Sequence, residues 1–389
     1  MSEPRTALLI AYANIQSDSR VRRQIDWLTE TGWSVDTLGL GEHPTEQVRT
    51  HFALVDQAPW VQTRAGSAII FGLLSHRRQF KLVQEDRIPK EAASRISSGE
   101  YDLVFFNDYE LTPWTGNKYV FTAEALRGRI HLDLHEFRDA RRKRDSAWRI
   151  LTDGYYRWAR RFIGDPVFNT RSTVATKLAD FYSQEFGFEP PTVVRNVPLY
   201  TDQAPTPVDP GNIKLLYHGM ASWSRGLREL IDAAELLDGR FSVTLMLTEN
   251  QNMIQKLSEL ARKSSRVEIV PPVPMRDVST AINPYDLEIM FFPPVSRNLK
   301  FALPNKLFEA VQARLGLVIG ESPMMQEVIR QHDNGRVVQG WTAQDLAASL
   351  NALTTDQIVE FKNASHQAAP VLCAETERGA FLNSIGIEA

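Results

Sequence analysis

The chain has 389 residues, of which 43% are hydrophobic and 23% charged, and its formal net charge at pH 7 is −3. These proportions are ordinary for a globular protein, and the length suffices for two domains. The slightly negative charge argues against general nucleic-acid binding. A single cysteine, Cys373, excludes an internal disulfide and a cysteine-based zinc site.

The apolar segments of the chain are short. The stretch Ala7–Ala13 near the N-terminus follows an acidic lead-in and is too short for a signal peptide. The longest apolar runs, Ser67–Leu74 and Leu287–Val295, have less than half of the roughly 20 residues that span a bilayer. We therefore expect a cytoplasmic protein.

The first half predicts a parallel α/β sheet. A buried strand is expected at Ala7–Tyr12, a helix at Val21–Thr31 and a second strand at Ser34–Leu40. Strand, helix and strand within about 30 residues form a parallel unit with a right-handed crossover. Two further strands are expected at Tyr101–Phe106 and Arg129–Leu134.

Both of these later strands end in polar residues, namely Asn107, Asp108, His135 and Glu136. In an open parallel sheet, ligands bind beyond the carboxyl ends of the strands. These positions are therefore the candidate site of the first half. A lone histidine at a strand end is also a common structural hydrogen-bonding residue, so a purely structural role for His135 stays open.

The strand–helix alternation restarts after Thr201–Asn212, a segment with three prolines that we interpret as a linker. Strands are expected at Ile213–His218, Phe241–Thr248, Val267–Val270, Leu287–Phe292 and Leu315–Gly320, and helices at Gly226–Leu237, Met253–Lys263 and from Pro304 onward. We therefore expect an α/β protein with two doubly wound Rossmann-like domains, residues 1–198 and 213–370. The linker 199–212 joins them, and they face each other across a cleft.

The segment Pro304–Ala310 combines a helix start with an unusual charge. Proline suits the first helical turn, whereas Lys306 opposes the helix dipole there unless an anion such as a phosphate is bound. Glu309 lies on the same helix face and is a candidate for binding a ribose diol. The alternative is an ordinary amphipathic helix with a Lys–Glu pair.

The turn Gly219–Gly226 precedes the first helix of the second domain. Its terminal glycines allow close approach of the backbone to a ligand, and Arg225 is placed to bind a diphosphate. The alternative is a simple turn with a surface arginine. This signal is weak by itself, because the spacing G-x-G-x-x-G of dinucleotide-binding turns is absent.

Together these motifs resemble those of the retaining glycosyltransferases of family 4, which have the GT-B fold. The resemblance covers most of residues 213–355 and is carried by Gly219…Arg225-Gly226, Pro304-Asn305-Lys306-Leu307-Phe308-Glu309-Ala310, Val318-Ile319-Gly320-Glu321-Ser322 and Asn334-Gly335. The first half is similar at Asp18-Ser19-Arg20-Val21, Asp133-Leu134-His135-Glu136 and Val194-Arg195-Asn196-Val197-Pro198.

The resemblance implies transfer of a sugar, with retention, from a nucleotide-diphosphate donor to a glycan, lipid-linked or small-molecule acceptor, in cell-surface polysaccharide or glycoconjugate synthesis. By family frequency, the expected donor is a UDP-sugar. It implies donor binding by Gly219, Arg225, Asn305, Lys306 and Glu309, and a catalytic His135 near the anomeric carbon. It also implies acceptor or phosphate contacts by Asp18, Arg20, Asp108 and Glu136, no metal and no other cofactor, and a C-terminal helix within 371–389 that crosses back onto the first domain.

The sequence departs from the family pattern at two positions that matter for function. Met220 stands where an arginine usually follows the first glycine, and Phe301 stands where a second acid would precede Glu309 by eight residues. Two other interpretations therefore stay open, a nucleotide-sugar epimerase of related fold and a catalytically silent partner subunit. For Asp18, capping of the following helix is an alternative to ligand contact.

One basic segment raises the question of a membrane. Residues 138–161 hold nine Lys or Arg and three Asp or Glu, and Trp148, Leu151, Tyr155, Trp158 and Phe162 form an apolar helical stripe. Such a helix can lie on an anionic bilayer, and Ser67–Lys81 is a second candidate. The alternative, which we favour for Trp148–Phe162, is that the stripe packs into the core of the first domain.

Overall fold

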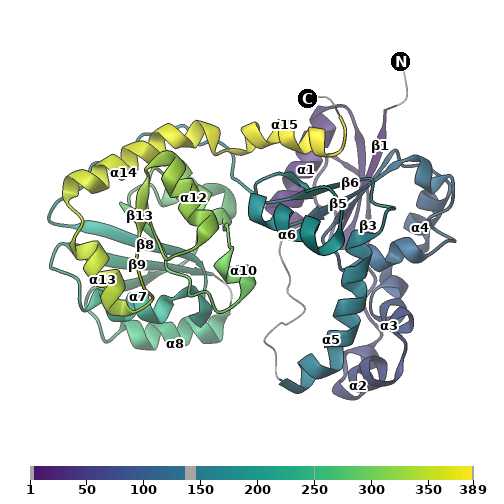
Figure 1. Cartoon of the computed structure of the whole chain (residues 1–389), viewed down its shortest axis with the longest axis horizontal. Helices are drawn as coiled ribbons and strands as arrows, with labels where there is room; N and C mark the ends of the chain where they lie inside the picture. Colours follow the sequence, from purple (N-terminus) through teal and green to yellow (C-terminus); the bar gives the residue numbers. More distant parts are fainter. Residues whose placement is uncertain (1–3, 136–145, 249, 388–389) are drawn as a thin grey trace. The chain divides into compact units, whose positions relative to one another are not determined.

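The computed structural model describes residues 4–135, 146–248 and 250–387. The chain divides into two compact units, each with one parallel sheet (Figure 1). The first unit contains the residues up to Arg195 and those from Arg378 onward, and the second contains Asn196–Glu377. Helix α15 (Ala374–Ser384) runs through the second boundary, so its last residues belong to the first unit.

The first unit has a seven-stranded sheet with the order β3-β2-β1-β4-β5-β6-β7, and all its neighbouring strands are parallel. Its strands are β1 (Thr6–Asn14), β2 (Ser34–Leu40), β3 (Val48–Ala53), β4 (Leu103–Asn107), β5 (Arg129–Leu134), β6 (Thr170–Thr173) and β7 (Thr192–Val193). Its helices are α1 (Ser19–Glu30), α2 (Arg64–Leu73), α3 (His76–Val83), α4 (Lys90–Ser97), α5 (Ser146–Arg160) and α6 (Thr176–Phe186).

The second unit has a six-stranded parallel sheet with the order β10-β9-β8-β11-β12-β13. Its strands are β8 (Ile213–Met220), β9 (Phe241–Thr248), β10 (Val267–Val270), β11 (Leu287–Met290), β12 (Gly316–Ile319) and β13 (Gly335–Val337). Its helices are α7 (Leu227–Ala234), α8 (Gln251–Ala261), α9 (Val278–Ala281), α10 (Arg297–Lys300), α11 (Asn305–Gln312), α12 (Pro323–His332), α13 (Ala343–Asn351) and α14 (Thr355–Ala368).

Helices cover both faces of each sheet, which explains the composition of the central strands. In the second unit, α8 lies on one side of the sheet, and α12 and α14 lie on the other (Figure 1). All four residues of β11 and all five of β4 are buried. A strand covered on both faces needs a continuous run of buried residues, not an alternating pattern. The predicted α/β class with two doubly wound sheets is confirmed.

The proline-rich segment after the first unit has no regular secondary structure, yet it is bound along the second unit. Gln203 Nε2 donates hydrogen bonds to the carbonyl oxygens of Ser279 at 3.0 Å and Gln312 at 2.7 Å. The guanidinium of Arg314, which is fully buried, donates to the carbonyl oxygens of Thr201 and Gln203. The segment expected to be a linker is therefore fastened to the second unit by its own Gln203 side chain and by the side chain of Arg314.

Two local expectations need correction. Pro304 is the extended N-cap residue of α11 and does not lie in its first turn. The stretch Ser67–Lys81 is not one continuous amphipathic segment, because the chain leaves the helical conformation at Leu74 and Ser75 between α2 and α3.

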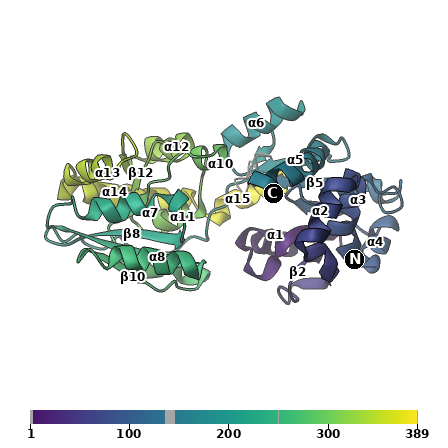
Figure 2. The same cartoon turned by 90° about the horizontal axis from the view of Figure 1, so that it is seen from below.

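The aromatic stripe of α5 packs on neighbouring helices. The ring of Tyr155 lies 5.5 Å from that of Phe71 in α2, and Trp158 contacts His76 and Phe80 in α3. The three helices lie side by side in Figure 1 and Figure 2. The core-packing alternative thus holds for the described side chains of the stripe. The side chain of Trp148 and residues 141–144 lie outside the described part. Among the described residues, no helix has the length and apolar content needed to cross a membrane.

Candidate functional site

The order of the second sheet reverses at the neighbouring strands β8 and β11. From β8 the chain proceeds outward through β9 and β10, and it then returns to β11 on the other side of β8. At such a switch point, the loops beyond the carboxyl ends of two adjacent strands diverge and leave a crevice in which ligands bind. The predicted donor-binding residues lie here, at the end of β8, in the turn that follows it and on α11.

Two glycines, one at the end of β8 and one at the end of the turn after it, are required by geometry. Gly219 has φ of +116°, and a Cβ atom there would lie 2.9 Å from Lys306 Nζ. Gly226 has φ of +70°, and a Cβ atom there would lie 1.8 Å from the carbonyl oxygen of Phe291. Any larger residue at Gly226 would collide with backbone. Both glycines therefore let the turn approach α11 and the end of β11 closely.

The side chain of Lys306 packs against the start of this turn, next to Gly219. Its Nζ donates a hydrogen bond to the carbonyl oxygen of His218 and lies 3.7 Å from the ring centroid of Tyr217. The guanidinium of Arg225 lies 4.8 Å from the ring centroid of Phe292, which Lys306 also faces at 5.5 Å. Burial lowers the pKa of Lys306 to about 7, although the nearby carboxylate of Glu288 acts in the opposite direction. Near neutral pH this amine is therefore close to half protonated.

His218 lies between two carboxylates. Its Nδ1 is 3.0 Å from Glu288 Oε2 on β11, and its Nε2 is 2.9 Å from Glu309 Oε2 on α11. Burial alone would lower the pKa of His218, but the charges and hydrogen bonds of the two carboxylates outweigh it and raise the pKa to about 9. His218 is thus an imidazolium at neutral pH. It joins the strand pair at the switch point to the helix that carries Lys306.

The sequence analysis missed His218 and Glu288. Both side chains are buried, with 5% and 0% of their residue surface exposed. The available signal was the presence of a histidine and a glutamate inside two otherwise apolar segments, Ile213–Met220 and Leu287–Met290. Buried ionisable residues are rare unless they are paired, so two of them in predicted neighbouring strands indicate a contact.

The predicted donor-binding residues come together in the second unit. Gly219, Arg225 and Lys306 meet around the rings of Tyr217 and Phe292, and Glu309 joins them through His218. Asn305 opens α11 next to Lys306 and is half-buried.

The two departures from the family pattern lie near this cluster. Met220 is 40% exposed, and its carbonyl oxygen accepts a hydrogen bond of 2.8 Å from the hydroxyl of Tyr217. Phe301 is half-buried with the ammonium of Lys300 5.6 Å from its ring centroid. Neither residue supplies a charge to the cluster.

In the first unit, Asp108 and His135 pair at the carboxyl ends of β4 and β5. The distance from His135 Nδ1 to Asp108 Oδ1 is 2.7 Å, and Asp108 has a left-handed backbone with φ of +67°. This contact brings the imidazole of His135 and the carboxylate of Asp108 together at the carboxyl edge of the sheet. Glu136, the remaining predicted residue of this strand end, lies outside the described residues.

Asp18 and Arg20 have structural contacts within the first unit. Asp18 Oδ1 accepts hydrogen bonds from the backbone N–H groups of Arg20 and Val21, so it caps α1. Arg20 Nη1 lies 2.8 Å from Oδ2 of the buried Asp133, which also accepts a 2.6 Å hydrogen bond from the hydroxyl of Ser172. The capping alternative for Asp18 is therefore what the structure shows.

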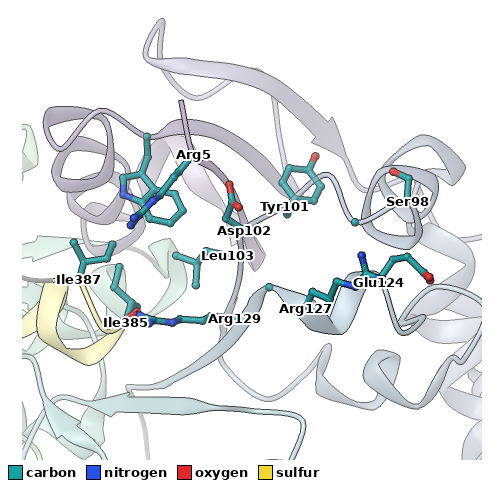
Figure 3. A pocket seen from close by; sticks show the side chains of 13 residues that line it. Arg5, Ser98, Tyr101, Asp102, Leu103, Glu124, Arg127, Arg129, Ile385 and Ile387 are labelled. Atoms are coloured by element: carbon teal, nitrogen blue, oxygen red, sulfur yellow. The ribbon is translucent and has the colours of Figure 1, made fainter. Parts of the chain in front are cut away.

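A hollow in the first unit lies at the amino edge of the sheet, opposite the carboxyl ends that carry Asp108 and His135. It has a volume of about 400 Å³ and is lined by residues that precede or start β1, β4 and β5, among them Arg5, Asp102 and Arg129 (Figure 3). None of the predicted site residues lines it. Within the described part of the chain, no three His, Cys, Asp or Glu side chains gather as a set of metal ligands.

Residues 212–356 match the family model described as glycosyl transferases group 1. No curated protein matches the chain. Among solved structures, WaaG, a glycosyltransferase involved in lipopolysaccharide biosynthesis, superposes with a TM-score of 0.70 at 13% identity, over 98% of this chain and 99% of that one.

Two further solved structures superpose on this chain over nearly its whole length. A glycosyltransferase from Rickettsia africae has a TM-score of 0.64 at 12% identity, with 98% of both chains covered. Anabaena HepE, solved in complex with UDP and glucose, has a TM-score of 0.65 at 13% identity, over 98% of this chain and 99% of that one. The chain therefore has the two-domain fold of GT-B glycosyltransferases, and its second unit carries the match to group 1 glycosyl transferases.

Proposed function

We propose that the protein is a glycosyltransferase that moves a sugar from a nucleotide-diphosphate donor, a UDP-sugar by our expectation, to an acceptor with retention of anomeric configuration. The observation that carries the proposal is the cluster at the β8/β11 switch point. There Lys306 and Glu309 extend from one helix toward the Gly219 turn, within the segment that matches the group 1 glycosyl transferases.

Each residue of the cluster has a chemical task in this proposal. Lys306, Arg225 and the N-terminal N–H groups of α11 neutralise the diphosphate, which is also the leaving group. Asn305 stands at the same helix end. Glu309 accepts hydrogen bonds from the ribose diol, since an ionised carboxylate has about four lone-pair sites and His218 occupies one of them. With these cations in place we propose transfer without a metal, which undiminished activity in excess EDTA would support.

In the first unit we propose His135 as the catalytic residue. The contact with Asp108 lies at the carboxyl ends of β4 and β5, the edge of a parallel sheet where a sugar or acceptor hydroxyl would bind. No enzymic nucleophile is required, because the leaving phosphate can take the acceptor proton on the face at which the sugar is attacked. Asp18 and Arg20 are less suited to ligand contact, given their contacts within the unit.

A screen of nucleotide sugars tests the proposal. With UDP-, GDP- and ADP-sugars, we expect slow release of free sugar and nucleoside diphosphate from one donor even without acceptor. Formation of an epimeric nucleotide sugar would instead identify an epimerase. Binding of no donor and release of no product would identify a silent partner subunit. The anomeric configuration of a transferred sugar, read by NMR, tests retention.

We also propose peripheral contact of the first unit with an anionic cytoplasmic membrane, in the synthesis of a cell-surface polysaccharide or glycoconjugate. The support is an exposed apolar set on α2 and α5, with Ile69 at 50%, Leu73 at 79% and Ile150 at 79% exposure, and the exposed cations Arg78 and Lys81 on the neighbouring helix α3. Apolar groups next to cations are typical of interfacial helices. Co-sedimentation with anionic vesicles, lost in the double variant Ile69→Glu/Leu73→Glu, is the expected result; no binding at low salt would contradict it.

A further inference from the structure

We propose that His218 and Glu288 are positioning residues of the donor site, which hold the carboxylate of Glu309 in place to receive the ribose hydroxyls of the nucleotide. This inference rests on the proposed function, and it adds two residues that do not touch the nucleotide themselves. They act through Glu309.

The contacts define the charge that His218 must carry. Nε2 is hydrogen-bonded to Glu309 Oε2 at 2.9 Å, and Nδ1 lies 3.0 Å from Glu288 Oε2 in an ion-pair contact without hydrogen-bond geometry. A neutral imidazole has one N–H and would direct a lone pair at one of these carboxylates. Only the imidazolium places a positive charge next to both carboxylates. Glu288, fully buried on β11, therefore keeps His218 in the doubly protonated form that binds Glu309.

The same residue also reaches the phosphate-binding side of the cluster. The backbone carbonyl of His218 accepts the hydrogen bond of Lys306 Nζ, while its side chain binds Glu309 one helical turn further along α11. One residue of β8 thus fixes both α11 side chains that are proposed to grip the nucleotide. Long charged side chains lose much rotamer freedom on binding, and fixing them in advance removes that cost.

A purely structural role in joining β8 and β11 is the competing explanation. A buried acid just before the same strand provides a control for it. Asp286, two residues before Glu288, forms a buried 3.0 Å ion pair with Lys362 away from the donor cluster. Lys362 also donates to the carbonyl oxygen of Tyr285 and to the hydroxyl of Thr206, so Asp286→Asn leaves it partly satisfied.

The experiment compares each nucleoside diphosphate with its 2′,3′-dideoxy counterpart, using whichever of UDP, GDP and ADP binds. Wild-type protein should prefer the ribose form by about tenfold or more, as expected for hydrogen bonds to a charged group. His218→Asn keeps an amide near Nδ1 for Glu288 and loses the contact with Glu309. We expect it to bind the ribose form more weakly and the dideoxy form as before, so that the preference falls toward one.

Two further variants give the inference independent tests. His218→Gln places its amide near Nε2, and we expect it to retain more of the ribose preference than His218→Asn. Glu288→Gln should lower the preference for the ribose form although it leaves Glu309 and His218 in place. If His218→Asn does not fold, Glu288→Gln serves as the test in its stead. The control Asp286→Asn should keep the wild-type preference.

The outcomes separate this inference from the proposed function. If wild-type protein binds none of the three nucleotides, the proposed donor site fails. If wild-type protein prefers the ribose form and both His218→Asn and Glu288→Gln retain that preference, the positioning role is wrong and the donor site stands. Equal weakening of both nucleotide forms would likewise overturn the positioning role, because that is the signature of a structural defect.

Discussion

The protonation of Lys306 makes donor binding dependent on pH in a predictable direction. Burial places the pKa of this amine at about 7, whereas that of His218 is about 9. Between about pH 6 and pH 8, the ammonium fraction of Lys306 falls from roughly nine in ten to roughly one in ten. His218 stays charged over this range. A diphosphate favours the ammonium form, so its affinity should fall about tenfold, or about 1.4 kcal/mol.

Calorimetric titration with a nucleoside diphosphate measures this effect twice. Titrations at about pH 6, 7 and 8 give the affinity, and a pair of buffers with different ionisation enthalpies gives the protons taken up on binding. Linkage predicts uptake of about half a proton near pH 7 and nearly one near pH 8. The nucleotide's own phosphate ionises more as pH rises, which acts in the opposite direction.

The variant Lys306→Met isolates the contribution of the amine. It should bind weakly and show only the pH dependence of the nucleotide, without proton uptake by the protein. Arg225 remains as the permanent cation of the cluster in both proteins. The reasoning is refuted if wild-type protein and Lys306→Met have the same pH profile and the same proton balance.

Three other predictions concern stability. His218 has a raised pKa, so its contribution to stability is complete below its unfolded pKa of 6.5 and is lost as pH rises through about 9. Lys306 has a lowered pKa, so the cost of burying its charge is relieved, and the fold gains stability, as pH rises above about 7. From pH 7 to 9 these two changes in the free energy of unfolding nearly cancel in the wild type. In Lys306→Met only the His218 contribution remains, so the free energy of unfolding, measured by urea titration, should fall by about 2–3 kcal/mol over this pH range. A free energy of unfolding that does not change with pH in this variant would argue against the charged His218. Gly226→Ala should cost more than about 2 kcal/mol and abolish nucleotide binding, because its Cβ meets the carbonyl oxygen of Phe291; wild-type melting would contradict the geometry. Arg314→Met should cost about 3 kcal/mol or more and expose the Thr201–Thr206 segment to limited proteolysis, and an equally resistant variant would show that the segment is held by other means.

The sequence predicted the fold class well because its strongest signals are local. Apolar runs such as Ala7–Tyr12 and Leu287–Phe292, separated by helical periodicity, reflect strands buried on both faces. Short elements such as β7, with two residues, and β13, with three, carry too few residues for a pattern. They form because an already twisted sheet offers them backbone partners.

The candidate site was predictable to a smaller extent. Lys306 stands out because a cation in the first helical turn opposes the helix dipole. Glu309 follows three residues later, a spacing that places it on the same face of the helix. The contact of His218 with Glu288 depends on β8 and β11 being neighbours, which follows from sheet order and not from any local spacing. The binding of Thr201 and Gln203 by the buried Arg314 was likewise hidden, since the proline content of that segment suggests a free linker.

The measurement that tests the central claim most directly is titration of the wild-type protein with UDP, GDP and ADP, alongside the variants Lys306→Met and Glu309→Gln. We predict that one of the three nucleotides binds in the micromolar range. Each substitution should weaken that binding about tenfold or more, as expected for loss of a charged contact with the diphosphate or the ribose. Failure of all three nucleotides to bind, or binding that is unaffected by both substitutions, would contradict a nucleotide-sugar site at the β8/β11 switch point.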